Sequence, residues 1–237
     1  MKHLTMMALS LSSAMLAACG GGDSGGSGAA DGNSGSAAPA SFALEAAYAK
    51  IMSAGATLNG SAADGADTYT LNLTVTPATD ELFEGVVRKK SLEAITLRRN
   101  GAPLTSASIE SFYNLSPFTS RGARYADGSI AVLTSSTGSF PTSARVGESG
   151  TLGTLTTYVN ASKATVRATT VFSWALQADS SATGVNPTAY ACLNSVVRNA
   201  AGNQTAIGFD CYRIDINGNA LGLRFTFAVP GKTLVFQ

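Results

Sequence analysis

The spacing of hydrophobic side chains changes along the chain, and the first regular stretch has helical spacing. Over residues 42–53 apolar side chains recur three and four positions apart, which predicts an amphipathic helix. Its apolar face consists of Leu44, Tyr48, Ile51 and Met52. Ser41 precedes the stretch as a candidate N-cap, and Gly55 follows it as a candidate end. The sequence therefore predicts one substantial helix near the start of the folded part.

From residue 67 onward the period is two. Hydrophobic and polar side chains alternate over residues 67–76, 166–176 and 221–229, which predicts half-buried antiparallel strands. Several dipeptides favour the positive φ angles of tight turns: Asn59-Gly60, Asp64-Gly65, Asn100-Gly101, Asp127-Gly128 and Asn217-Gly218. A Ser- and Thr-rich stretch over residues 135–143 predicts a long loop within the same domain. The strand spacing predicts about eight to eleven strands.

These elements predict a single, mainly β domain over residues 41–237. Several of the expected strands exceed ten residues, which favours a strongly curved antiparallel sheet, barrel or half-barrel-like, with one N-terminal helix. A β-sandwich is the alternative, because the alternation of side chains is the same in both architectures.

The chain before this domain has the composition of an export signal. Met1, Lys2 and His3 form a positively charged start, and residues 4–16 are mostly apolar but too few to span a bilayer comfortably. The junction Leu16-Ala17-Ala18-Cys19 resembles the bacterial lipobox. That resemblance implies a lipoprotein signal peptide over residues 1–18 and a Cys19 that carries fatty chains. An ordinary signal followed by an incidental cysteine is the alternative.

The segment that follows Cys19 predicts a flexible tether over residues 19–40. Residues 20–40 are rich in glycine and serine, with no aromatic residue and no aliphatic residue larger than alanine. Such a segment buries too little surface to offset its ordering entropy. The resemblance to lipoproteins implies a protein of the cell envelope, anchored to a membrane by the lipid on Cys19. Gly20 stands where an aspartate retains enterobacterial lipoproteins at the inner membrane, so the outer membrane is favoured.

The two other cysteines predict a disulfide. Cys192 and Cys211 lie on consecutive strand-like runs, and a hairpin centred on the turn at residues 200–203 places them directly opposite each other. Directly opposed Cβ atoms are within disulfide reach, and an exported protein lies in an oxidising compartment. We expect a structural bond that adds about 3 kcal/mol to stability.

The composition removes most catalytic chemistry. The one histidine, His3, lies in the expected signal peptide, and the cysteines are assigned to lipid and disulfide. Histidine- and thiol-based catalysis and histidine-ligated metals are therefore excluded for the mature chain, and we expect no metal and no cofactor. Residues 147–150 and 215–219 resemble a nucleophile elbow and a calcium loop only in part, and both are predicted to be turns. The remaining carboxylates are scattered, and no pair is singled out: Glu81, Glu84, Glu93, Glu110 and Glu148.

Charge is almost balanced, with one local excess of cations. The 16 basic and 15 acidic residues nearly cancel, so nucleic acid is not expected as a partner. Five cations lie on two runs that could form a hairpin around Ser91 and Leu92: Arg88, Lys89, Lys90, Arg98 and Arg99. Brought together, they would attract anionic lipid head groups or an acidic partner. The alternative is a charged edge strand that discourages aggregation.

Three functions are compatible with this sequence. The first is a non-catalytic envelope lipoprotein that binds a protein or glycan partner or has a structural role. The second is a carrier that holds a hydrophobic ligand or lipid between the curved sheet and the helix, which requires an internal cavity of ligand size. The third is a glycan hydrolase, which requires two buried acids that face each other.

Overall fold

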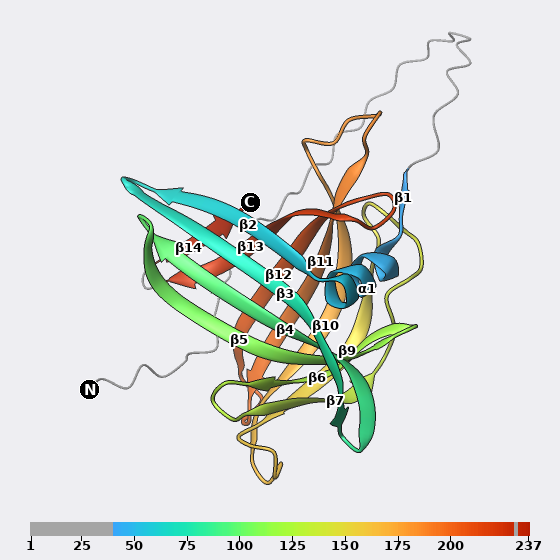
Figure 1. Ribbon diagram of the computed structural model, residues 1–237, viewed down its shortest axis with the longest axis vertical. Coiled ribbons are helices and arrows are strands. Elements are labelled where there is room, and N and C mark those ends of the chain that lie inside the picture. Colours follow the sequence, from blue (N-terminus) through green and yellow to red (C-terminus); the bar gives the residue numbers. More distant parts are fainter. Residues whose placement is uncertain (1–39, 230–231) are drawn as a thin grey trace, which may run out of the picture.

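A computed structural model describes residues 40–229 and 232–237 of the chain (Figure 1). The expected signal peptide, Cys19 and nearly all of the expected tether lie outside the described residues. The predictions for that part therefore stay predictions.

The described chain consists of one helix, a large antiparallel sheet and one small strand pair. The helix is α1 (Leu44–Ala54), and the small pair consists of β1 (Ser41–Phe42) and β8 (Ala144–Arg145). The large sheet contains β2 (Ala56–Asp64), β3 (Asp67–Phe83), β4 (Val86–Arg99), β5 (Ala102–Leu115), β6 (Phe118–Tyr125), β7 (Ile130–Ser136), β9 (Ser149–Tyr158), β10 (Val166–Ala178), β11 (Thr188–Asn199), β12 (Gln204–Asp215), β13 (Ala220–Val229) and β14 (Lys232–Phe236).

The large sheet curves into a barrel that is closed except along one seam. Its 12 strands follow the order β14-β13-β12-β11-β10-β9-β7-β6-β5-β4-β3-β2, and every neighbouring pair is antiparallel. The curvature brings β2 to β13 and β14, where hydrogen bonds of 3.1 and 3.3 Å join Ser61 and Gln237 in both directions. The expected curved, mainly β fold is confirmed, and the sandwich alternative is wrong. The number of strands exceeds the expected range because a short strand such as β14 carries too few positions to show alternation.

Irregular positions in the ladder help the sheet to bend. The register shifts by one residue between Phe112 and Tyr113 in β5 opposite β6, and between Phe172 and Ser173 in β10 opposite β9. Bulges of this kind increase the local twist of a strand pair and tilt it away from the plane of its neighbours. Twist of this kind tilts the strands relative to one another, and such a tilt is needed for a sheet to close into a barrel.

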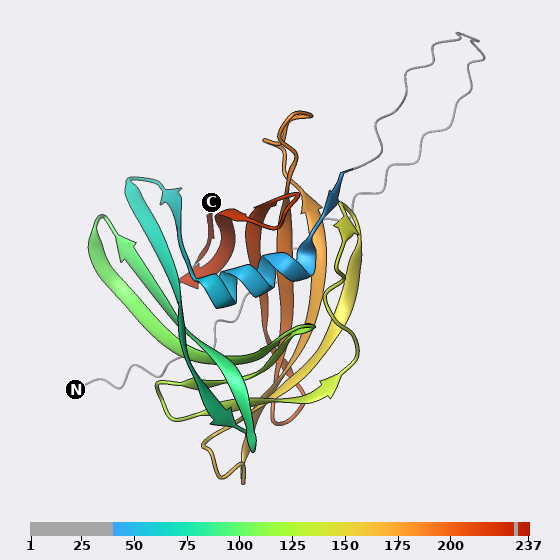
Figure 2. The same ribbon diagram turned by 45° about the vertical axis from the view of Figure 1, so that its right-hand side comes forward.

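The helix lies across the interior of the curved sheet (Figure 2). Leu44, Ala47, Tyr48 and Ile51 are buried, and α1 packs against β3, β4 and β6. The predicted apolar face is thus confirmed for these positions, and Met52 is partly buried beside them. The sheet contributes the alternating side chains of β3 to the same core: Tyr69, Leu71, Leu73 and Val75.

The beginning of the helix differs from the expected one. The helix starts at Leu44 rather than at residue 42, and Ala43 stands at the N-cap without a side-chain hydrogen bond. Ser41 does not cap it, because residues 41 and 42 pair with β8 and the Ser41 hydroxyl bonds to that of Ser143. The end is confirmed at Gly55, which has a φ of +83°.

One predicted turn is wrong for a reason that lies far away in the sequence. The dipeptides at 64–65, 100–101, 127–128 and 217–218 form turns with positive φ at their glycines, but Asn59 and Gly60 lie in the middle of β2. A Cβ atom on Gly60 would lie 2.6 Å from Leu223 Cδ1 and 2.9 Å from Phe236 Cβ. The glycine therefore allows the side chains of Leu223 and Phe236 to lie close to the β2 backbone across the seam. The sequence around residue 60 gives no sign of this contact.

The predicted loop covers one end of the helix. Residues 135–136 still belong to β7, and the next strand of the large sheet is β9; between the two strands, β8 pairs with β1. The backbone oxygen of Pro141 accepts a hydrogen bond from the Glu45 amide at 3.1 Å, which fixes the loop on the first turn of α1.

Candidate functional site

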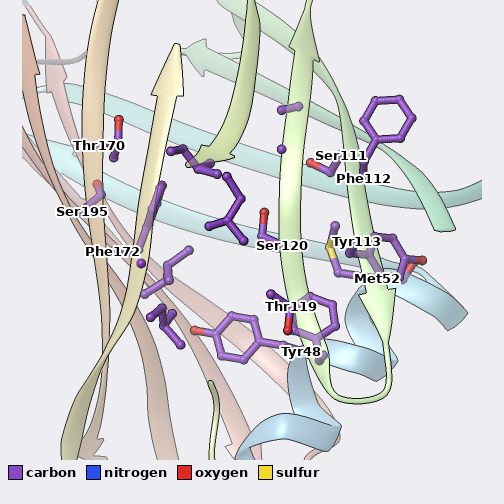
Figure 3. Close-up of a pocket in the computed structure, with 18 of the residues that line it drawn as sticks. Tyr48, Met52, Ser111, Phe112, Tyr113, Thr119, Ser120, Thr170, Phe172 and Ser195 are labelled. Atoms are coloured by element: carbon purple, nitrogen blue, oxygen red, sulfur yellow. The ribbon is translucent and has the colours of Figure 1, made fainter. Parts of the chain in front are cut away.

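A cavity of about 390 Å³ lies inside the curved sheet, next to α1. Its walls come from the helix, from both halves of the sheet and from the loop after β7, and most of the side chains that line it are apolar or aromatic. Figure 3 shows side chains of α1, β5 and β10 around the same space. The aromatic lining consists of Tyr48, Phe112, Tyr113, Phe118, Tyr125, Phe140, Phe172 and Tyr212.

Two tyrosines hold the helix at the cavity. The Tyr48 hydroxyl donates to the Ala191 carbonyl at 3.2 Å, so the side chain reaches from α1 to β11. The Tyr113 hydroxyl donates to the Met52 carbonyl at 3.0 Å and links β5 to the same helix. The Tyr48 ring stacks on Phe140 with 4.1 Å between the ring centroids. Burial raises the pKa of Tyr48 and Tyr113, so both hydroxyls stay neutral.

Two acidic side chains also line the cavity. Glu93 projects from β4 and Asp210 from β12, and six strands lie between β12 and β4 in the sheet order. The acids therefore reach the cavity from different walls. The barrel surrounds Asp210, but part of its side chain is accessible to solvent. This accessible part borders the cavity.

The enclosure changes the acidity of both groups. Burial raises the pKa of Glu93, and a hydrogen bond from the Ser111 hydroxyl opposes this shift. Burial, together with the nearby charge of Glu93, raises the pKa of Asp210 to about 6. Within the described part of the chain, no donor bonds to the Asp210 carboxylate, and neither acid belongs to an ion pair. Asp210 thus titrates close to neutral pH.

Sequence reasoning named Glu93 only as one of several scattered carboxylates and missed Asp210. The alternation of inward and outward side chains along each strand could have revealed them. Asp210 occupies the same face of β12 as Tyr212 and Ile214, and both of these are buried. An acid at an inward position of a strand is unusual, because burial of a charge without a partner is costly.

The cysteine pair lies where it was expected. Cys192 and Cys211 are directly opposite each other in the β11–β12 ladder and form a disulfide. Their side chains point away from the cavity, because they alternate with inward residues such as Leu193 and Tyr212. The Arg224 guanidinium covers the bond, with its Nη2 atom 3.8 and 3.9 Å from the two sulfur atoms. The disulfide therefore joins β11 to β12, the strand that carries Asp210.

The predicted cluster of five cations does not form. No turn occurs at Ser91 and Leu92, because β4 runs unbroken through them and Ser91 is buried. Arg88 and Arg98 therefore stand about 30 Å apart along one strand. The edge-strand alternative is also wrong, because β4 pairs with both β3 and β5.

Each of these cations has an ion-pair or hydrogen-bond partner in the protein. Lys89 lies 2.9 Å from Asp80 and Lys90 2.5 Å from Glu81. At the other end of β4, Arg99 pairs with Asp67. Arg88 donates to Asn114, and Arg98 to the Gly101 carbonyl. A contact of these residues with an anionic surface stays a prediction, now for two separate groups.

Both motif-like segments form turns. The Glu148 amide donates to the Arg145 carbonyl ahead of β9, and Gly147 has a φ of +95°. The Asp215 carboxylate accepts hydrogen bonds from the backbone amides of Asn217 and Asn219 within the β12–β13 turn. The tip of this turn is attached to α1, because Lys50 donates to the Asn217 carbonyl at 2.8 Å.

The chain matches no protein-family model, no curated protein and no solved structure. In the described part of the chain, no three or more His, Cys, Asp or Glu side chains are grouped so as to hold a metal ion. Over residues 40–229 and 232–237, no helix combines the length and the apolar character that crossing a membrane requires.

The buried acid makes stability depend on pH. The pKa of Asp210 is raised from 3.8 to about 6 in the folded protein, so between these values the native state holds a proton that the unfolded state has released. The stability of the wild type should therefore fall as pH rises through this window. We expect Asp210→Asn to raise the free energy of unfolding by about 1 kcal/mol at pH 7.5, a value reduced from the full shift because the group borders the cavity.

Urea unfolding at pH 7.5 and pH 4 measures this effect. At pH 4 the advantage of Asp210→Asn should have nearly vanished, since the wild-type acid is then protonated in the folded state. Glu84→Gln, at the exposed β3–β4 turn, serves as the control: it removes a surface ion pair with Lys163 and should lower the free energy of unfolding at pH 7.5 by less than about 1 kcal/mol, the opposite direction from Asp210→Asn. An equal effect of Asp210→Asn at both pH values would contradict the titration assigned to this group.

Proposed function

We propose that this protein is a membrane-anchored envelope lipoprotein whose barrel binds and carries a small, largely apolar molecule. The observation that carries the proposal is the internal cavity of about 390 Å³, which lies within the size range of ligand-binding pockets. Its aromatic walls supply apolar contact area, and Ser120, Thr170 and Ser195 supply a few polar atoms.

The expected anchor and tether are part of the same proposal. Two or three fatty chains on Cys19 would hold the protein on the membrane, since each buried methylene contributes about 0.8 kcal/mol. The tether would let the barrel stand off the bilayer surface, and it leads directly into β1 and α1. The helix that borders the cavity is thus, after β1, the element of the fold nearest in sequence to the expected membrane anchor.

Filling the cavity tests the proposal. Thr170 faces the cavity from β10, and its neighbour Val171 lies on the opposite face of the same strand with 43% of its surface exposed. We expect Thr170→Phe to weaken binding of the neutral dye N-phenyl-1-naphthylamine at least tenfold, because the added ring occupies the ligand volume. Fluorescence titration of the purified domain measures the affinity.

Val171→Phe is the matched control, because it adds the same ring to the outer face of β10. Its affinity for the dye should equal that of the wild type. Two outcomes speak against a carrier: no dye binding to the wild type, or equal binding to both variants, since the dye would then lie elsewhere.

A second candidate function rests on the two acids in the cavity. Glu93 and Asp210 line one cavity from different walls, and hydrolysis of a glycosidic bond requires two carboxyl groups, one of them an acid with a raised pKa. Incubation with a panel of nitrophenyl glycosides tests it. Release of nitrophenol by the wild type and its loss in Glu93→Gln would support hydrolysis, and no release from any glycoside of the panel would speak against it.

A further inference from the structure

The charges inside the cavity are unbalanced. Two acidic side chains line it, and no lysine, arginine or histidine is among the residues that do so. The arginines and lysines that form ion pairs in the described residues bind other acids, for example Arg213 with Asp179 and Arg167 with Asp127. Ionised Glu93 and Asp210 therefore have no compensating charge from the described part of the protein.

Such an arrangement is costly without a ligand. An ionised carboxylate enclosed by protein loses solvation, and a second one nearby adds repulsion. Glu93 has partial compensation from the Ser111 hydroxyl, whereas no protein donor of the described residues reaches the Asp210 carboxylate. The cavity thus offers a hydrogen-bond and charge acceptor that the described residues leave unused.

The aromatic lining fits the same kind of ligand. Phe172 and Tyr212 border the cavity from β10 and β12, and Tyr48 borders it from the helix. The face of an aromatic ring attracts a cation, and this attraction is stronger where water is excluded. A neutral apolar ligand would gain from the rings but leave both acids without a partner.

We infer that the cavity takes a small organic cation, an ammonium compound whose charge is neutralised by Glu93 and Asp210 and whose apolar body packs on the aromatic walls. The inference rests on the proposed carrier function and names its ligand class. Amine ligands with hydrogens on nitrogen can also donate to the free Asp210 carboxylate. An anionic ligand is disfavoured by repulsion from the same two groups.

The titratable groups that face the cavity determine how binding depends on pH. Besides the two acids they are tyrosines: Tyr48, Tyr113, Tyr125 and Tyr212. Burial raises the pKa of all four, so none of these tyrosines ionises between pH 5 and 7.5. Because Asp210 has a pKa of about 6, its negative charge is largely lost at pH 5.

A pair of isosteric probes tests the inference. Phenyltrimethylammonium and tert-butylbenzene have the same shape, and only the first carries a charge, which does not change with pH. At pH 7.5 we expect the cation to bind the purified protein at least tenfold more tightly than the hydrocarbon, measured by displacement of N-phenyl-1-naphthylamine. At pH 5 the affinity for the cation should fall about tenfold, and that for the hydrocarbon should not fall, because protonation removes only the charge interaction.

The variants assign the effect to the cavity. Asp210→Asn should weaken binding of the cation about tenfold and leave the hydrocarbon unchanged, whereas Glu84→Gln, with the same change in net charge on the exposed β3–β4 turn, should affect neither. Equal affinities for the two probes, or a preference for the hydrocarbon, would overturn the cation assignment and leave the carrier function standing. Displacement of the dye by neither probe also overturns the assignment, and failure of the dye itself to bind rejects the carrier function.

Discussion

Replacement of Cys19 by serine is expected to move the protein from the membrane to the soluble fraction. The lipobox resemblance implies that the sulfur of Cys19 carries two fatty chains, and two or more chains bind a bilayer almost irreversibly. Serine has no thiol to acylate, so the whole of this attachment is lost. Detergent phase partitioning measures the change, and the intact mass of the purified wild type shows whether the chains are present.

Two further proteins complete this experiment. In the first, an ordinary cleavable secretory signal replaces residues 1–19, which separates loss of the lipid from retention of an unprocessed signal. In the second, Ser24→Ala changes the expected tether and leaves Cys19 intact, so it should partition with the detergent like the wild type. If the protein without Cys19 stays in the detergent phase as firmly as the wild type, the assignment as a lipoprotein is wrong.

Substitution of Gly122 by alanine is expected to destabilise the barrel by about 4 kcal/mol, the largest effect we predict for a single added methyl group. Gly122 lies in β6 with a φ of +146°, a region that side-chain-bearing residues rarely adopt. A Cβ atom there would lie only 2.1 Å from the Ala131 carbonyl oxygen of β7 and 2.7 Å from Cζ of Phe83. The Ala131 carbonyl belongs to the backbone of the β6–β7 ladder, and the Phe83 ring is stacked on Phe112 with 4.2 Å between the ring centroids. Neither group can therefore move aside easily.

The same hairpin provides the matched control. Gly128, in the turn between β6 and β7, also has a positive φ of +83°, but nothing lies within 4 Å of the position a Cβ would take. Gly128→Ala should therefore cost only about 1 kcal/mol, from backbone strain alone. Urea unfolding of both variants measures the difference. Similar losses for the two would mean that close packing between β6, β7 and Phe83 does not limit the stability of the barrel.

Several features of the fold could be predicted because they depend on neighbours in the sequence. The alternation over residues 67–76 predicted which side of β3 is buried, since successive side chains on a strand point to opposite faces. The disulfide could be predicted for a similar reason. A tight hairpin fixes its own register, so the position of the turn at residues 200–203 determined that Cys192 lies opposite Cys211.

The errors have a common physical origin. Asn59-Gly60 has the composition of a turn, yet β2 needs a glycine there because β13 and β14 approach it from the far end of the sheet. The cations of β4 were placed in a hairpin because charged residues at both ends of a strand resemble two short strands. Only the pairing of β4 with β3 and β5 shows one continuous strand, in which Ser91 is buried.

The helix face, the half-buried strands and the disulfide register could be predicted from the sequence, because each depends on residues within one or two consecutive elements. The membrane location stays a prediction from the lipobox resemblance. Tertiary structure alone decided that the sheet closes around a cavity and that Glu93 and Asp210 share it. That outcome depends on curvature summed over many strands, which brings β4 and β12 to the same space. The acidity of Asp210 follows from this enclosure by the whole barrel, since desolvation depends on everything that surrounds a charge and not on its neighbours in sequence.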